Sequence, residues 1–237
     1  MSRQPVAGIV RHLILLPLAV GLLVSCSTPQ TRPDAASQAT VDEREAQLQA
    51  LQEFSFEGGL GIWTDEQSLS ARIKWLQSAD TLEVDMNGPL GIGNMRLNQT
   101  DGSASLYRGE VMLASGPSAN VVLQQGLALE APVPLDQIQL WVRGLPGDAL
   151  SVIRDADNRI ASLRYVDSTG VSWLAKIRRY ELLKLPATGN DLSLPSLITA
   201  KSERYSVRIV LRNWKLQTEA AVPKVHESHK RLAIPAR

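Results

Sequence analysis

The sequence predicts a mainly β domain in which one curved antiparallel sheet carries helices on one side. Three observations predict it: period-two alternation through much of residues 54–216, two short helical segments within that region, and turn residues between the alternating runs. Alternation of apolar and polar residues is typical of antiparallel strands with one buried and one solvated face. A curved sheet covered by helices can enclose an apolar space lined by inward side chains.

The alternation is clearest in four runs, at residues 71–75, 81–86, 171–178 and 205–212. In the second of these runs, Leu82, Val84 and Met86 share one face and their polar neighbours share the other. Turn-forming pairs such as Gly88-Pro89 and Asp101-Gly102 separate such runs. Each run is therefore interpreted as a strand.

Helical patterns occur in three places. Ser118 can cap a helix that runs to about Leu127. A second short helix is expected from Leu135 to Arg143, because Leu135, Ile138 and Trp141 fall on one face and Gly144 follows as a stop. A third, before the strands, is expected from Asp42 to Phe54, with Asp42 as its cap.

The N-terminus has the pattern of a lipoprotein signal. Arg3 and Arg11 make a positively charged start, and an uncharged apolar run follows from Leu13 to Val24. The run is shorter than the roughly 20 residues that a bilayer span needs but suits a secretory signal. The run ends in Ser25-Cys26, as in the bacterial lipobox, where the cysteine carries diacylglycerol. An ordinary signal peptide with a chance cysteine is the alternative.

The cysteine count favours lipidation. Cys26 is the only cysteine in the chain, and a lone cysteine in a secreted protein needs an explanation. Several acyl chains give stable anchoring where one gives marginal binding. Ser27 stands where an aspartate commonly retains lipoproteins in the inner membrane, so the expected location is the periplasmic face of the outer membrane.

These features predict four parts: a signal peptide (1–25), a lipidated cysteine with a flexible Ser/Thr/Pro/Ala-rich tether (26–41), a folded domain (42–216) and a disordered tail (217–237). The tail holds His226 and His229, for which a metal or surface role is the minor alternative.

Composition and motifs argue against an enzyme, a cofactor-binding protein and a metalloprotein. The expected folded region has no histidine, and its charges are balanced, with a formal net charge of +1 for the whole chain. No clustered basic face indicates nucleic acid. Asp155 and Asp157 could bind a cation weakly but are interpreted as turn formers. An outer-membrane scaffold or small-lipid-binding protein remains the alternative from another class.

Several ordered stretches resemble the LolB family of outer-membrane lipoprotein receptors. They are Phe56-Glu57-Gly58-Gly59-Leu60, Ala71-Arg72-Ile73-Lys74-Trp75, Asn87-Gly88-Pro89-Leu90-Gly91, Pro132-Val133-Pro134-Leu135, Leu140 to Gly147, Leu185-Pro186 and the strand from Val207 to Trp214. The tail after Leu216 and the arginines of residues 205–212 have no match in that pattern.

The resemblance implies an open antiparallel half-barrel with a helical lid over an apolar cavity. It implies a receptor that accepts the acyl chains of lipoproteins from a soluble periplasmic carrier, LolA, and inserts these lipoproteins into the inner leaflet of the outer membrane. No nucleotide or other cofactor is implied. The expected partners are the carrier, the cargo acyl chains and outer-membrane lipid, and the receptor is expected to be a monomer.

The resemblance also suggests site residues. Leu90, flanked by Pro89 and Gly91, matches the leucine of the family's membrane-inserting loop; a turn leucine folded over the sheet edge is the alternative. Apolar faces of the expected strands and second helix supply the cavity candidates, which are Ile73, Trp75, Leu82, Val84, Met86, Leu97, Trp141 and Trp173. Each of these could instead be ordinary core.

Three arginines of the late strand region, Arg204, Arg208 and Arg212, could meet acidic groups on the carrier and speed encounter. A solvated strand face is the competing and favoured interpretation.

Overall fold

The computed structural model describes residues 35–66, 68–88, 94–129, 133–186 and 189–216. Its contacts divide the chain into two units, Met1–Pro33 and Asp34–Arg237. Among the described residues, the hydrophobic core extends from Val41 to Leu211, within the second unit. In the part of the chain that the structure describes, no helix combines the length and apolarity needed to cross a membrane.

The described residues form eleven strands and three helices. The strands are β1 (Phe54–Trp63), β2 (Ser68–Ser78), β3 (Thr81–Asn87), β4 (Met95–Thr100), β5 (Ser103–Arg108), β6 (Val111–Gly116), β7 (Ser151–Arg154), β8 (Ile160–Val166), β9 (Ser172–Lys184), β10 (Asp191–Lys201) and β11 (Ser206–Leu216). The helices are α1 (Ala35–Ala50), α2 (Ala119–Gly126) and α3 (Leu135–Trp141).

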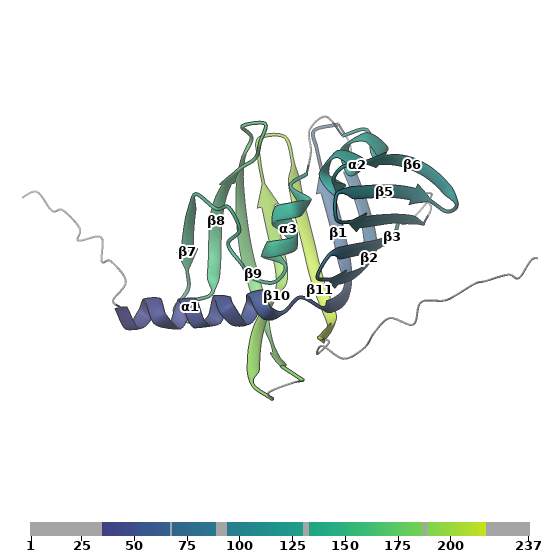
Figure 1. The fold of residues 1–237 in the computed structure, drawn as a ribbon. Helices are drawn as coiled ribbons and strands as arrows, with labels where there is room; N and C mark the ends of the chain where they lie inside the picture. The colour runs from purple at the N-terminus through teal and green to yellow at the C-terminus, as the bar shows by residue number, and fades with distance from the viewer. Residues whose placement is uncertain (1–34, 67, 89–93, 130–132, 187–188, 217–237) are drawn as a thin grey trace, which may run out of the picture. The chain divides into compact units, whose positions relative to one another are not determined.

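All the strands belong to one open antiparallel sheet in the order β6-β5-β4-β3-β2-β1-β11-β10-β9-β8-β7. Only the β1–β11 pair joins strands that are distant in sequence, and its register runs from Phe54 opposite Leu216 to Trp63 opposite Ser206. The sheet curves around α2 and α3, which lie on its inner face (Figure 1). The predicted fold, a curved antiparallel sheet with helices on one side, is confirmed.

The period-two pattern places the core as expected. In β3, Leu82, Val84 and Met86 are buried, whereas the residues between them are not. Aromatic rings reinforce this inner face: Phe56 stacks on Trp75 with ring centroids 5.4 Å apart, and Trp214 lies 4.9 Å from Phe56. Such pairs add about 0.5–1.5 kcal/mol each beyond their buried area.

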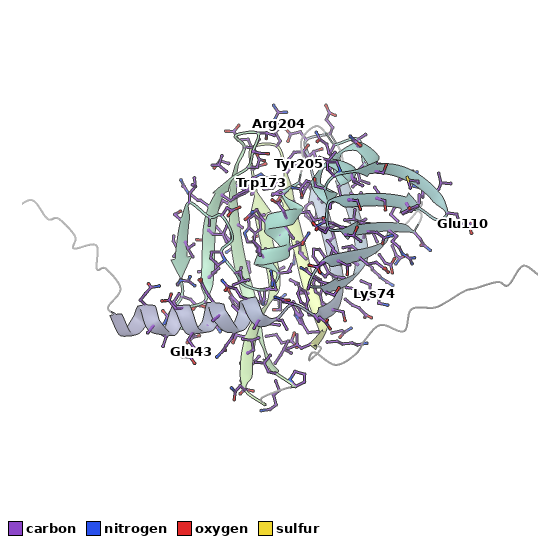
Figure 2. The ribbon with its side chains drawn as sticks, viewed as in Figure 1. Glu43, Lys74, Glu110, Trp173, Arg204 and Tyr205 are labelled. Carbon is purple, nitrogen blue, oxygen red and sulfur yellow. The ribbon has the colours of Figure 1, made fainter. Side chains whose placement is uncertain are left out.

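A second aromatic pair joins β9 to the connection before β11. Trp173 on β9 stacks on Tyr205, which precedes β11, with centroids 6.1 Å apart and an interplanar angle of 12° (Figure 2). The Trp173 Nε1–H donates to Asp167 Oδ2 at 3.1 Å. Trp173 is therefore a core residue whose indole N–H has a hydrogen-bond partner.

The first helix differs from the sequence prediction. It spans Ala35–Ala50 instead of residues 42–54, so Asp42 is not its cap and residues 35–41 are helical rather than tether. The Ala-rich stretch after Pro33 has high helix propensity, which extends the helix towards the N-terminus. Phe54 belongs to β1, where it pairs with Gln77 and Leu216, because sheet pairing outweighs the local periodicity.

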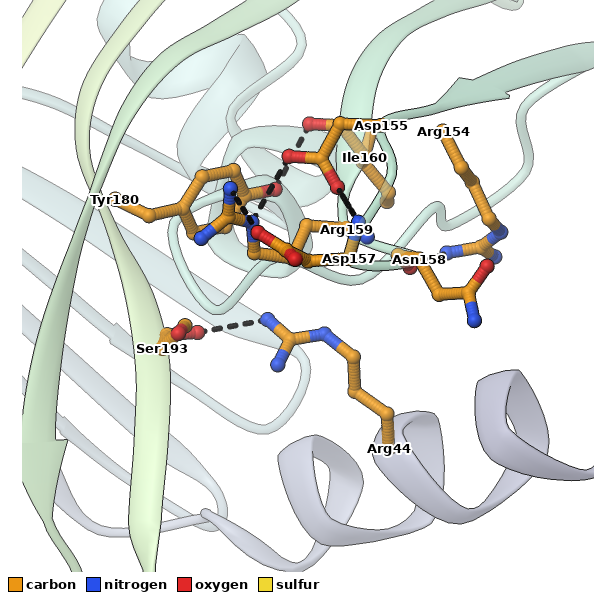
Figure 3. Close-up of polar contacts among 9 residues, drawn as sticks. All are labelled: Arg44, Arg154, Asp155, Asp157, Asn158, Arg159, Ile160, Tyr180 and Ser193. Carbon is orange, nitrogen blue, oxygen red and sulfur yellow. Dashed lines mark hydrogen bonds and ion pairs between the residues drawn. The ribbon is translucent and has the colours of Figure 1, made fainter. Parts of the chain in front are cut away.

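Helix α1 is fixed to the sheet by a polar cluster (Figure 3). Arg44 donates to the Ser193 carbonyl at 2.7 Å and lies 5.9 Å from the centre of the Tyr180 ring. Arg159 lies 4.9 Å from the same ring centre, and Arg154 bonds Glu45. Burial raises the pKa of Tyr180, whose hydroxyl donates to the Ile160 carbonyl at 2.8 Å. The cluster joins α1 to β8, β9 and β10.

Asp155 and Asp157 form a turn, as predicted. The Asp155 carboxylate accepts from the backbone N–H groups of Asp157 and Arg159, both at 3.0 Å, and Asn158 adopts a left-handed conformation with φ of 58°. Among the described residues there is no group of acidic, histidine or cysteine side chains that could hold a metal ion.

Candidate functional site

A small apolar cavity lies between the sheet and the two inner helices. Its volume is about 40 Å³ and its lining is entirely apolar. The sheet supplies residues from β1 to β4 and from β11, and the helical segment supplies the opposite wall. The lining residues are Leu60, Ile62, Ile73, Trp75, Val84, Met86, Leu97, Leu123, Leu127, Val133, Leu135, Ile138, Val207 and Ile209.

Five of the eight predicted cavity residues line this cavity. They are Ile73, Trp75, Val84, Met86 and Leu97, which occupy inward positions of β2, β3 and β4. Leu82, Trp141 and Trp173 are buried but do not line it. Trp141 instead packs edge-on against Tyr165 at 6.1 Å, in the part of the core beneath α3.

Most residues of the helical wall were not among the predicted cavity residues. Leu123 and Leu127 come from α2 and its C-cap, and Leu135 and Ile138 come from α3. Their helical spacing was visible in the sequence, but the sequence did not show which strands the helices would cover. The remaining lining residues come from β1 and β11, the two strands that pair across the longest separation in sequence.

The two helices are tied to each other by one polar side chain. Asn120 Oδ1 accepts from the backbone N–H groups of Leu135 at 2.7 Å and Asp136 at 3.3 Å, and Asn120 Nδ2 donates to Asp136 Oδ1 at 2.8 Å. Ser118 caps α2 by accepting from the Val121 N–H at 3.5 Å, as predicted. These bonds make α2 and α3 one lid, which we define as residues 118–129 and 133–142.

The lid rests on the sheet mainly through apolar contacts. From α2, Ala119, Val122 and Leu123 are buried against the core. The Ala119 N–H also donates to Gln99 Oε1 on β4 at 3.3 Å. Gly126 allows close approach, because a Cβ there would come 2.5 Å from Leu106 Cδ2. An apolar ligand can replace such contacts at little cost, since it offers the same kind of surface.

The far end of the lid is held more firmly. Gln137, which is buried, donates to Asp148 Oδ2 at 2.9 Å and accepts from the Asp148 N–H at 3.0 Å. Arg143 donates to the Leu51 carbonyl at 3.3 Å, and burial lowers the pKa of Arg143. Polar side chains therefore anchor the lid at its α3 end.

The outer face of the sheet carries the late arginines. Arg208 and Arg212 are exposed on β11, in agreement with the favoured interpretation of a solvated strand face. Arg204 lies in the connection between β10 and β11. Cys26, the Pro89-Leu90-Gly91 segment, His226 and His229 lie outside the described residues.

The fold and the site define a class of protein: an open antiparallel half-barrel whose helical lid closes over a wholly apolar cavity. A family model described as "Outer membrane lipoprotein LolB" matches residues 52–214. The chain belongs to the LolB family. The match includes the strand from Ser206 to Trp214, which the sequence resemblance had only partly covered.

Two relatives carry the same description as the family model. The outer-membrane lipoprotein LolB of Yersinia pestis (strain Pestoides F) is 27% identical over 208 residues, covering 86% of this chain and 95% of its own length. The protein of the same description from Yersinia pseudotuberculosis (strain IP 31758) gives the same values. A crystal structure of a LolA superfamily protein from Nitrosomonas europaea matches with a TM-score of 0.47 and 10% identity, covering 77% of this chain and 94% of the other.

The protein is therefore an outer-membrane lipoprotein that acts as a receptor in lipoprotein localisation. Its family is non-enzymatic and implies a LolA-type partner.

Proposed function

We propose that the apolar cavity receives the acyl chains of lipoproteins from a LolA-type carrier and that the domain then passes them to the inner leaflet of the outer membrane. The observation that carries the proposal is the cavity itself: every lining residue is apolar, and the lid over it is held to the sheet by contacts of the same kind. No part of this lining could bind a polar ligand.

The cavity must expand to do this. Sites for drug-sized ligands have volumes of about 300–1,000 Å³, whereas about 15 Å³ already holds one water. The cavity of about 40 Å³ therefore belongs to a closed state. The α2 end of the lid is the part that moves in this proposal, because buried apolar residues hold it to the sheet, whereas the far end has the Gln137–Asp148 hydrogen bonds.

The free energy of burying acyl chains favours their direct transfer from one apolar site to another. Burial of each CH₂ is worth roughly 0.8 kcal/mol, so a free acyl chain does not cross an aqueous compartment at a useful rate. Lid opening exposes the cavity lining, and the incoming chain covers it again. Because one apolar surface replaces another, the step needs no nucleotide.

We assign the other parts of the chain to anchoring and delivery. Residues 1–25 are the signal peptide, Cys26 is the lipidated anchor, residues 27–34 are the tether and residues 217–237 are a C-terminal tail. Leu90, between Pro89 and Gly91, enters the membrane during delivery. The Gly-Pro-Leu-Gly sequence and the matching loop of the family support this assignment.

Photo-crosslinking locates the acyl chains. A lipoprotein carrying a photoreactive group on its acyl chains is bound to residues 27–237 and irradiated, and the modified residues are identified by mass spectrometry. We expect crosslinks to Ile73, Met86 and Leu97 and to the lid, and none to Trp173, which is equally buried but outside the lining. Crosslinks concentrated around Trp173, or spread over the outer face, would place the chains elsewhere and favour a scaffold role.

A further inference from the structure

The outer face of the sheet, opposite the lid, has a groove that runs along β1 between β2 and β11. Its volume is about 610 Å³. The floor is formed by Gly59 and Gly61, and residues of both flanking strands line it, among them Ser70 and Arg72 on β2 and Arg208 and Val210 on β11. Trp63, the last residue of β1, also lines the groove.

The groove exists because two outward positions of β1 lack side chains. Gly59 pairs with Arg72, and Gly61 pairs with Arg208. Packing explains Gly61, since a Cβ there would lie 2.2 Å from the Trp63 ring. Nothing in the fold explains Gly59, whose Cβ would meet no atom closer than 3.9 Å. A glycine within a strand weakens it, and such a position often marks the approach of a ligand.

The two arginines of the groove have no acidic residue opposite them in the register, unlike the basic residues next to them on the same strands. Two residues from Gly59 along β1, a row of charged residues crosses five strands, and the sign of the charge alternates from strand to strand. The row consists of Arg212, Glu57, Lys74, Asp85 and Arg96. Arg96 donates to Asp85 at 2.7 Å within this row. Two rows cross the groove: Arg72 lies between Gly59 and Asn87 in one, and Arg208 lies between Gly61 and Thr199 in the other.

Neither Arg72 nor Arg208 forms an ion pair with any residue that the structure describes. Both are exposed, and two guanidinium groups on either side of an open floor suit an anion with several oxygens, such as a phosphate.

The position of the groove indicates where the phosphate comes from. Asn87 and Gly88, at the end of β3, form one end of it and lead directly into the segment that contains Leu90. Trp63 is 40% exposed, and tryptophan is enriched where proteins meet the headgroup region of a membrane.

We propose that this groove binds the phosphate of an anionic phospholipid headgroup at the outer membrane, with Arg72 and Arg208 on the phosphate and Trp63 beside it. The inference rests on the proposed function in one respect, namely that this end of the sheet faces the membrane during delivery.

The first variant fills the groove without changing its charge. In Gly59→Val, a β-branched side chain occupies the floor of the groove and suits a strand, so the fold is retained. Residues 27–237 are floated with vesicles of equal parts phosphatidylglycerol and phosphatidylcholine. We expect binding to fall about tenfold for Gly59→Val, Arg72→Gln and Arg208→Gln, the scale of losing a charge-assisted hydrogen-bonded contact. Lys176→Gln removes one charge from the same face outside the groove and should bind like the parent.

Parent-like vesicle binding by all three groove variants would overturn the headgroup site. So would groove variants that keep vesicle binding but lose affinity for a LolA-type carrier, since the groove would then be a protein-docking surface. Binding of inorganic phosphate that needs no vesicle and depends on Arg72 and Arg208 would also overturn it.

The same proteins separate this inference from the proposed function. A parent domain that accepts acyl chains, with groove variants that bind vesicles normally, overturns only the headgroup site. A parent domain that binds vesicles through the groove but never accepts an acyl chain supports the site and contradicts acyl transfer.

Discussion

A disulfide that closes the lid should abolish acyl-chain uptake. Gly126, at the end of α2, and Ala114, on β6, can form one: a Cβ at residue 126 would lie 3.6 Å from the Ala114 Cβ, within the usual range for a disulfide. In residues 27–237 with Ala114→Cys and Gly126→Cys, no other cysteine competes, because Cys26 is the only native one. The oxidised protein is held in the state with a cavity of about 40 Å³.

The measurement is binding of a fluorescent acyl-chain probe before and after reduction. We expect no measurable binding by the oxidised protein and parent-like binding after a reductant is added. Oxidation should also stabilise the domain by about 2–3 kcal/mol, since the crosslink closes a short loop. The matched control, Ala114→Ser with Gly126→Ser, meets the same contact with Leu106 without the bond and should bind under both conditions. Equal binding by the oxidised and reduced forms would show that the α2 end does not open.

Leu90→Glu should separate acceptance of cargo from its delivery. A carboxylate within a membrane costs about 2–3 kcal/mol, equivalent to about a hundredfold change in a rate or affinity that depends on insertion. The cavity is lined by other residues, so uptake from the carrier should be unchanged. Uptake is measured as co-purification of labelled lipoprotein with the variant, and delivery as the appearance of that label in outer-membrane vesicles.

The matched control places the same charge on another exposed apolar residue. Val111, at the start of β6, is 64% exposed, and Val111→Glu should deliver cargo normally. If Leu90→Glu also delivers normally, residue 90 does not enter the membrane. If both variants fail, added negative charge rather than the position of Leu90 is responsible.

The sequence predicted those parts of the fold in which one local pattern dominates. Strands β2, β3, β9 and β11 alternate cleanly, and Ser118 has an unambiguous capping role. Strand β10 was missed because Pro195 and irregular pairing between Pro195 and Ile198 interrupt its alternation, although it lies well inside the sheet. Strand β6 was missed because it lies at an edge, where Val111 and Met112 are both exposed and the alternation disappears.

The site was predictable as far as strand faces specify it. Ile73, Val84 and Leu97 lie in the wall of the cavity because inward strand positions that are neighbours in register share one wall. Trp141 and Trp173 lie in the adjoining core, and size and apolarity do not distinguish that core from the cavity. The groove on the outer face was not predicted at all, because it depends on the β1–β11 pairing across about 150 residues.

The central claim is that this domain takes acyl chains directly from a carrier. The most direct measurement mixes residues 27–237 with a LolA-type carrier loaded with a labelled lipoprotein, in the absence of nucleotide, and separates the two proteins. We expect the label to move to the domain as a one-to-one complex. The disulfide that closes the lid should block the formation of this complex. A folded domain that takes no label while the carrier keeps it would contradict the account.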